Sequence, residues 1–315
     1  MHDNPTLLSY VPHGSDPNAF YPINESSKDF VEFDQFKSEF LSKHGNPEFV
    51  ILFNSRNIRR KSPGDIVLSY KRFCDGLTKD QAKKCLLVMK TQVIDDNGTD
   101  LLAVKKAICP KYRIVFIPDL LNTQQMNWLY NLSDATIFLS SAEGFGLAAN
   151  ECMLAANGIL IAPVTGGLQD QMRFEDENGQ WINVNCDFPT NHRGRYKKTG
   201  EWAIPLFPNA RILNGSPATP FIFDDYTDSE DAAKAIRTVY DMPKDERKRR
   251  ASLGRSWAMS SESGMSSEEM CNRFASSMNK LFETWMPPTN KWELIKVDER
   301  PLMDDMGITW WEFNQ

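Results

Sequence analysis

The sequence lacks the features that mark several classes of protein. Its 315 residues contain no apolar run of the roughly 18–20 residues that a membrane-spanning helix needs. The N-terminus has no basic stretch followed by an apolar one, so no secretory signal peptide is predicted. The six cysteines include no C-x-x-C pair and have no nearby histidine, which excludes a structural zinc site. We therefore expect a soluble cytoplasmic protein with reduced, mostly buried thiols and no membrane span.

A basic excess is absent as well. The chain has 36 Lys and Arg against 42 Asp and Glu, a net charge of −6. This balance argues against a protein whose main work is coating nucleic acid or anionic membrane. A local basic run, with His192 and Arg193 at one end and Lys198 at the other, is interpreted as a solvated loop. Nucleic-acid binding is the alternative interpretation of that run.

Short apolar runs alternate with helical patterns from about residue 47 onward. This alternation predicts right-handed crossovers and an α/β, Rossmann-like, doubly wound parallel sheet. Such sheets bind ligands at the carboxyl ends of their strands. The predicted strands are 49–53, 85–89, 113–117, 135–139 and 159–162, and the predicted helices are 65–73, 100–108, 123–132, 147–156, 229–240, 245–259 and 266–285.

The domain organisation follows from where this rhythm starts and stops. Residues 1–46 have no sustained period and are interpreted as a linker-like N-terminal segment. Residues 47–285 form the predicted Rossmann-like domain. Within it, 181–223 is rich in Gly, Pro, Asn and aromatic residues and is interpreted as an insertion, either an extended loop or a hairpin. Residues 286–315 form a C-terminal tail without a clear period.

The loop after the fourth predicted strand carries chemistry suited to a polar ligand. Glu143 is followed by Gly144-Phe145-Gly146-Leu147, and Glu151 lies two turns into the next helix. A carboxylate accepts hydrogen bonds from hydroxyls, glycines allow close approach of the backbone, and free N–H groups mark the helix start. Recognition of polyols and of phosphates both fit. Taken alone, the two glutamates fit exposed helix carboxylates equally well.

Two more loops at the same edge of the sheet add positive charge and backbone donors. The loop after the first predicted strand contains four cations, Arg56, Arg59, Arg60 and Lys61. A diphosphate leaving group needs such fixed positive charge, although an isolated basic loop is usually just solvated. After the fifth predicted strand, the turn Thr165-Gly166-Gly167 brings N–H groups that suit an oxyanion.

These motifs together resemble a known family. The segment from Glu143 to Glu151, the Arg56-x4-Lys61 pair and the turn at Thr165 are similar to the C-terminal, nucleotide-sugar-binding domain of retaining family-4 glycosyltransferases of the GT-B fold. Residues 11–22 resemble the linker that leads into that domain. The resemblance covers about residues 10–180 in motif order and 220–285 in general helical pattern.

The resemblance implies a role for each matching position. Arg56 and Lys61 would bind the diphosphate and stabilise the charge that develops on it as the glycosidic bond breaks. Glu143 would accept hydrogen bonds from sugar hydroxyls, and Glu151 would hold the ribose diol. The backbone of the glycine-rich loops would contact the sugar and phosphates, which makes these residues donor-binding: Gly144, Phe145, Gly146, Leu147, Thr165, Gly166 and Gly167.

The expected function is therefore transfer of a hexose-like sugar, with retention of configuration, from a nucleoside diphosphate sugar to an unknown acceptor. UDP and GDP are the expected nucleotides. No cofactor is expected, and no metal, because side-chain cations and helix N-termini replace the divalent ion in such enzymes. The sequence has no D-x-D triplet, and the pairs Asp95-Asp96, Asp224-Asp225 and Asp304-Asp305 are interpreted as turns or caps.

Three departures from the family pattern keep alternatives open. Ala148 stands where a proline commonly follows the loop, the insertion at 181–223 is long, and no acceptor-binding domain precedes the linker. We therefore expect either a fragment or an acceptor site supplied by another domain or a partner chain. The alternatives are a non-catalytic nucleotide-sugar-binding subunit and a glycosyltransferase that acts on a modified nucleic-acid base.

Overall fold

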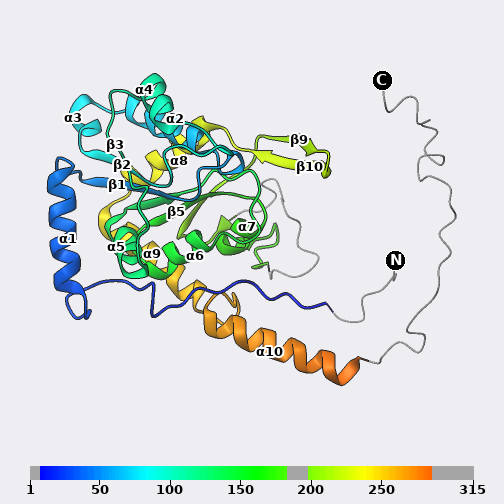
Figure 1. Ribbon diagram of the computed structural model, residues 1–315. Helices are drawn as coiled ribbons and strands as arrows, with labels where there is room; N and C mark the ends of the chain where they lie inside the picture. Colours follow the sequence, from blue (N-terminus) through cyan, green and yellow to red (C-terminus); the bar gives the residue numbers. More distant parts are fainter. Residues whose placement is uncertain (1–7, 183–197, 286–315) are drawn as a thin grey trace, which may run out of the picture. The chain divides into compact units, whose positions relative to one another are not determined.

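The computed structural model describes residues 8–182 and 198–285 (Figure 1). The chain divides into two compact units, Met1–Ser277 and Met278–Gln315, and everything that bears on the site lies in the first. In the second unit the described residues are 278–285. The predicted tail 286–315 and the basic run up to residue 197 lie outside the described residues.

The centre of the first unit is a six-stranded parallel sheet in the order β3-β2-β1-β4-β5-β8. Neighbouring positions β1 and β4 are where the order reverses, which is the switch point at which doubly wound sheets bind ligands. The prediction of a Rossmann-like parallel sheet is confirmed. The strands are β1 (Phe49–Asn54), β2 (Cys85–Lys90), β3 (Ile114–Phe116), β4 (Ala135–Ile137), β5 (Ile159–Pro163) and β8 (Ala203–Leu206).

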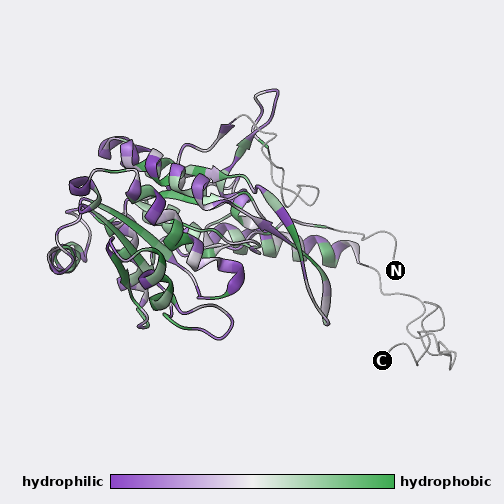
Figure 2. Ribbon diagram, turned by 90° about the horizontal axis from the view of Figure 1, so that it is seen from above, coloured by the Kyte–Doolittle hydropathy of each residue, from purple (hydrophilic) through white to green (hydrophobic). Residues whose placement is uncertain are grey.

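The strands are buried on both faces. Successive side chains of a strand point to opposite sides of the sheet, and each side packs into a hydrophobic cluster. Phe49, Ile51 and Phe53 of β1 belong to one hydrophobic cluster, and Val50 and Leu52 belong to another. Figure 2 shows the apolar strands between the more hydrophilic outer faces of the helices. One cluster includes side chains of α2 (Pro63–Asp75), α4 (Leu101–Ile108) and α8 (Ser229–Asp241), and the other includes side chains of α5 (Thr123–Leu132), α6 (Leu147–Ala155), α7 (Gly167–Met172) and α9 (Lys244–Ala258).

Local signals in the sequence set several helix boundaries. The Asp100 side chain caps α4 by accepting a hydrogen bond from the N–H of Ala103 at 3.0 Å. Asn122 caps α5 in the same way through the N–H of Gln125, at 2.9 Å, and the Gln125 side chain completes a capping box. Both of these helices were predicted from the sequence. Two short helices were not: α3 (Lys79–Ala82) and α7, which has only six residues.

The N-terminal segment is more ordered than its composition predicts. No helix was predicted in residues 1–46, which show no sustained period, but α1 (Phe30–Lys43) lies there. Phe33 and Phe36 occupy one side of this helix, and the Phe36 ring lies 5.3 Å from that of Trp128 on α5. Before α1, Phe20 reaches into the core and packs edge-on against Tyr130. The apolar face of α1 is therefore covered by the domain that it precedes.

The interval 181–223 holds part of the sheet as well as a hairpin. Its described part contains β8, the sixth strand of the central sheet, so interpreting the whole interval as an insertion is wrong for Ala203–Leu206. Pro205 lacks a backbone donor, which fits an edge strand. A hairpin, one of the two forms expected for this interval, is present as the antiparallel pair β9 (Ala210–Ser216) and β10 (Thr219–Tyr226). A second, two-residue pair joins β6 (Phe174–Glu175) and β7 (Lys198–Thr199).

The remaining features concern the exposed end and the thiols. Helix α10 (Ser267–Thr284) contains the exposed Phe274 and Phe282, and the exposed Trp285 follows directly after it. Within residues 8–182 and 198–285, no helix is long and apolar enough to cross a bilayer. Among the described residues four cysteines are buried and Cys271 is exposed, and these five are free thiols, as the prediction of reduced, mostly buried thiols requires. Cys186 lies outside the described residues.

Candidate functional site

Four segments meet at the carboxyl edge of the sheet, beside the switch point. They are the loops after β1, β4 and β5 and the base of the β9–β10 hairpin, and they surround an open cavity of about 540 Å³. Three of these segments were predicted to meet from the rule that parallel strands end at one edge. The cavity is lined by Arg60, Ser141, Ala142, Glu143, Gly144, Thr165, Gly166, Arg211, Phe223 and Asp225.

Glu143, which lines the cavity, forms an ion pair with Lys61. The Lys61 Nζ donates to the Glu143 Oε2, and the two side chains are 11% and 12% exposed. Arg60 adds a weaker contact, with its Nη1 3.5 Å from the same oxygen and 2.9 Å from the Ala142 carbonyl. Burial lowers the pKa of Lys61, and the nearby Glu143 offsets part of that effect. The structure thus brings together two of the predicted site residues.

Backbone geometry explains the glycines of the loop after β4. Gly146 has φ +89°, and Gly166 has φ +48°, values that disfavour residues with a Cβ. A Cβ on Gly166 would lie 1.9 Å from the Glu143 carbonyl oxygen, so the two loops touch directly there. The Gly167 N–H donates to that same carbonyl at 3.1 Å. The turn after β5 therefore holds the backbone of Glu143 and Gly144 in place.

The other loop residues flank this turn. Phe145 is buried, and its carbonyl accepts a hydrogen bond from the Gln171 side chain at 2.7 Å. Leu147 is the first residue of α6 and is half exposed. The nine-residue helix α6 therefore begins directly after the loop, and the free N–H groups of its first turn favour an anion.

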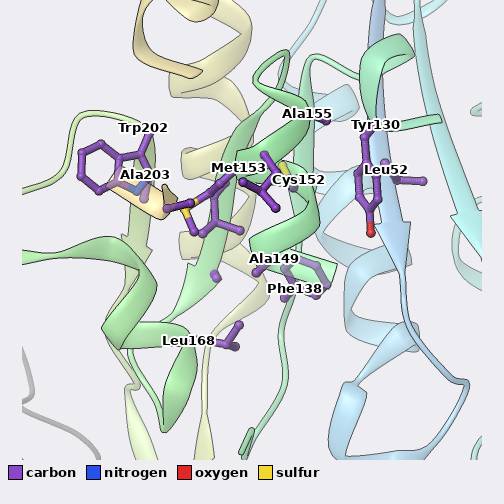
Figure 3. Packing of buried hydrophobic residues seen from close by; sticks show 14 of the residues in the cluster. Leu52, Tyr130, Phe138, Ala149, Cys152, Met153, Ala155, Leu168, Trp202 and Ala203 are labelled. Atoms are coloured by element: carbon purple, nitrogen blue, oxygen red, sulfur yellow. The ribbon is translucent and has the colours of Figure 1, made fainter. Parts of the chain in front are cut away.

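Glu151 lies on α6, after this loop, and its side chain is held by a buried tyrosine. Its Oε2 accepts from the Tyr130 hydroxyl at 2.7 Å, and that hydroxyl accepts from the Asn54 Nδ2 at 2.7 Å. Burial raises the pKa of Glu151, and the hydrogen bond from Tyr130 lowers it in part. Figure 3 shows Tyr130 beside Leu52 of β1, and both belong to the hydrophobic cluster that also contains side chains of α6. Asn54 and Tyr130 were not found from the sequence.

No family model matches the sequence, and neither does any curated protein. Solved structures of low sequence identity do share its fold. Sucrose-phosphate synthase from Thermosynechococcus elongatus is 16% identical, with a TM-score of 0.55, over 87% of this chain and 53% of that one. HepE from Anabaena, in complex with UDP and glucose, is 15% identical, with a TM-score of 0.55, over 85% of this chain and 55% of HepE.

A third similar structure is a single domain. It is the C-terminal domain of LpcC, a glycosyl transferase group 1 family protein from Francisella tularensis, and 96% of it is covered. The match spans 78% of this chain, at 15% identity and a TM-score of 0.51. The chain has the fold of a GT-B C-terminal domain. It spans about half the length of the two larger enzymes.

Within the GT-B domain, Arg56 lies apart from the other predicted site residues. Its side chain is 63% exposed, and its Nε donates to Asp95 at 3.2 Å, on the loop after β2. Asp95 itself accepts from the N–H of Asn97, so Asp95 does form a turn, as predicted. The structure thus places Arg60 at the cavity, whereas Arg56 is engaged outside it.

The GT-B domain also has a polar link that sequence reasoning missed. The Asp225 carboxylate is 5% exposed and accepts from the Thr165 Oγ1 at 2.8 Å and from the Arg211 Nε at 3.1 Å. The Asp225 N–H donates to the Ser141 carbonyl at 2.9 Å. Interpreting Asp224-Asp225 as a turn or cap is therefore wrong, because both lie on β10 and Asp225 joins three site segments. Asp304-Asp305 lies outside the described residues.

Two further predictions concern charge. In the part of the chain that the structure describes, no group of three His, Cys, Asp or Glu side chains is placed to hold a metal ion. Of the basic run, Lys198 is described, and its exposed Nζ lies 3.2 Å from the largely buried Glu175. The solvated-loop interpretation is wrong for this residue, because Lys198 lies on strand β7, which pairs with β6.

Proposed function

We propose that this domain binds a nucleoside diphosphate sugar and transfers the sugar, with retention of configuration, to an acceptor. The observation that carries this proposal is the Lys61–Glu143 ion pair, built from two loops at the switch point of the sheet. A cation beside a carboxylate matches a donor that has a diphosphate next to a polyol. The roles below are those of a family-4 glycosyltransferase, proposed for the residues that match its motifs.

The diphosphate is bound by cations and by the start of α6. Lys61 supplies a point charge, and the backbone N–H groups from Gly144 to Leu147 supply donors at a helix N-terminus. Arg56 joins them after it leaves Asp95, because an ion pair with so exposed an arginine costs little to break. Fixed positive charge stabilises the diphosphate as the glycosidic bond breaks, so leaving-group electrostatics supply most of the catalysis.

The two glutamates bind the sugar and the ribose of the donor. When a diphosphate takes the charge of Lys61, the Glu143 carboxylate becomes free to accept hydrogen bonds from sugar hydroxyls. Glu151 holds the ribose diol, and Tyr130 orients its carboxylate from below. Thr165, Gly166 and Gly167 complete the pocket through the backbone of the turn. The turn and Tyr130 thus hold part of the pocket in place, whereas Lys61 and Arg56 exchange their partners for the diphosphate when the donor binds.

UDP is the first nucleotide to test, because HepE was solved with UDP and glucose and with UDP-glucose, and GDP is the second. The proposed reaction needs no cofactor and no metal ion. The acceptor contacts belong to another domain or partner chain, and the proposed divisions of this chain remain 1–46, 47–285 and 286–315. A cytoplasmic location is part of the same proposal.

A thermal-shift panel of UDP, GDP, ADP and their sugars tests the binding step. At least one compound is expected to raise the unfolding temperature, with and without EDTA. Lys61→Ala and Arg56→Ala are each expected to weaken that response, and Lys83→Ala, an exposed lysine paired with Asp80 away from the site, serves as the control. A panel in which no nucleotide has an effect contradicts the proposal.

Activity assays separate this proposal from its alternatives. A chain that binds the nucleotide but neither hydrolyses nor transfers the donor sugar behaves as a non-catalytic binding subunit. Addition of an acceptor domain is then the deciding measurement. Transfer to a modified base in DNA, with affinity that falls steeply as salt rises, supports the nucleic-acid alternative.

A further inference from the structure

We propose that Arg211, on the β9–β10 hairpin, is an additional donor-binding residue that contacts the diphosphate. The inference rests on the proposed function and assigns a role to a part of the chain outside the motifs that suggested it. The juxtaposition that supports it is a guanidinium lining the same cavity as Glu143 and Gly144 while fixed from behind by a buried carboxylate.

The hydrogen bonds of Arg211 leave its outer edge free for a ligand. Only its Nε is engaged, with the Asp225 Oδ1 at 3.1 Å, and within the described residues its two Nη groups have no hydrogen-bond partner. The side chain is 34% exposed, so the unengaged edge is accessible. A planar guanidinium held in this way presents N–H groups in a fixed fork, the geometry that suits phosphate oxygens.

The surroundings of Arg211 favour an anion. The two carboxylates that line the cavity are already paired, Glu143 with Lys61 and Asp225 with Arg211. The negative charge of each carboxylate is therefore balanced by its own cation, and an incoming anion meets little repulsion from either carboxylate. Arg211 lies on the Glu143 side of the site, whereas Glu151 does not line this cavity. That placement fits contact with the diphosphate or sugar end of the donor better than contact with the nucleoside.

The buried Asp225 holds Arg211 in a fixed position. It is 5% exposed, its other oxygen accepts from Thr165, and its backbone N–H donates to Ser141. One carboxylate thereby ties the hairpin to the loops after β4 and β5. The position of Arg211 is consequently coupled to the same segments that hold the glycine-rich loop.

Isothermal titration with Arg211→Gln tests the inference. The glutamine Nε2 stands in the place of the arginine Nε and keeps a donor for Asp225, while the charge and the fork are removed. Affinity for the nucleoside diphosphate that the panel identifies is expected to fall about tenfold or more, as is affinity for inorganic pyrophosphate. Arg211→Lys is expected to recover part of the loss, since it keeps the charge without the fork.

A matched control comes from the same hairpin. Asn214→Ala removes a cross-strand hydrogen bond to Asp224, at 3.0 Å, but Asn214 does not line the cavity. It is expected to bind every compound as the wild type does. Unfolding temperatures without ligand show that each variant is folded.

Two results overturn the inference while leaving the proposed function intact. In the first, Arg211→Gln binds the diphosphate and pyrophosphate as tightly as the wild type. In the second, its loss of affinity is confined to the nucleotide sugar, which assigns Arg211 to the sugar. A wild-type chain that binds neither nucleotides nor nucleotide sugars is a different result. It contradicts the proposed function itself, and the inference with it.

Discussion

Replacing Glu143 with glutamine separates the stability that the Lys61–Glu143 ion pair supplies from the binding of an anion by Lys61. Glu143→Gln removes the counter-charge of Lys61 but keeps an oxygen that accepts a hydrogen bond. Both side chains are nearly buried, at 11% and 12% exposure, so the charge left on Lys61 is poorly solvated. Lys61→Met, which removes the cation and keeps the length of the side chain, is the matched variant.

The magnitude follows from the burial of the pair. Removing one partner of a fully buried ion pair costs roughly 3–5 kcal/mol. Here the glutamine oxygen still accepts from Lys61, and we expect a loss of about 2 kcal/mol in the free energy of unfolding. For a domain of this size, that loss lowers the unfolding temperature by about 4–8 °C.

Differential scanning fluorimetry with and without the nucleoside diphosphate is the assay. A bound diphosphate supplies the negative charge that Glu143→Gln lacks, so the nucleotide is expected to raise the unfolding temperature of this variant at least as much as that of the wild type. Lys61→Met is expected to lose most of the response. If Glu143→Gln unfolds at the wild-type temperature and ignores the nucleotide, the ion pair is not the anion site.

The other predictions concern groups around the site and away from it. Tyr130→Phe removes the hydroxyl that holds Glu151, and we expect a loss of about 1–2 kcal/mol in urea unfolding together with weaker nucleotide binding in calorimetry. Burial raises the pKa of Asp170 to about 6, so the native state binds its proton more tightly than the unfolded state and stability falls as pH rises from about 4 to 6. Asp170→Asn is expected to lose that dependence, a change of up to about 3 kcal/mol relative to the wild type when urea unfolding is compared at the two ends of the range. Arg247→Ala breaks the largely buried pair with Asp134, at 3.0 Å, and is expected to cost about 3–5 kcal/mol in urea unfolding with unchanged nucleotide affinity.

Each of these expectations has a contrary result. A Tyr130→Phe variant of wild-type stability and affinity shows that the hydroxyl does not position Glu151. Parallel pH profiles for the wild type and Asp170→Asn exclude a raised pKa at that carboxyl. Lost nucleotide binding in folded Arg247→Ala contradicts the separation of the structural pair from the site.

The sheet and the site loops were predictable because their signals are local. The five predicted strands are continuous apolar runs, and parallel strands that end at one edge bring their following loops together. The missed elements have weaker local signals. Phe33, Phe36 and Phe40 do recur at helical spacing in α1, but they stand in a segment dominated by Pro, Asn, Ser and Asp. Strand β8 is only four residues long and contains a proline.

The partners of the site residues were not predictable, because they come from distant parts of the chain. Tyr130 meets Glu151 only through the packing of α5 on α6, and Asp225 meets Thr165 across 60 positions in the sequence. Arg56 and Arg60 are four residues apart in one loop, and nothing in their order shows that the first pairs with Asp95. Side-chain partners of this kind depend on tertiary packing.

A crystal structure with the nucleoside diphosphate bound tests the central claim most directly. We expect phosphate density between Lys61 and the N–H groups that follow Glu143, with the ribose at Glu151 and the Lys61–Glu143 pair broken. Density at another surface, or a nucleotide bound with that ion pair intact, would contradict it.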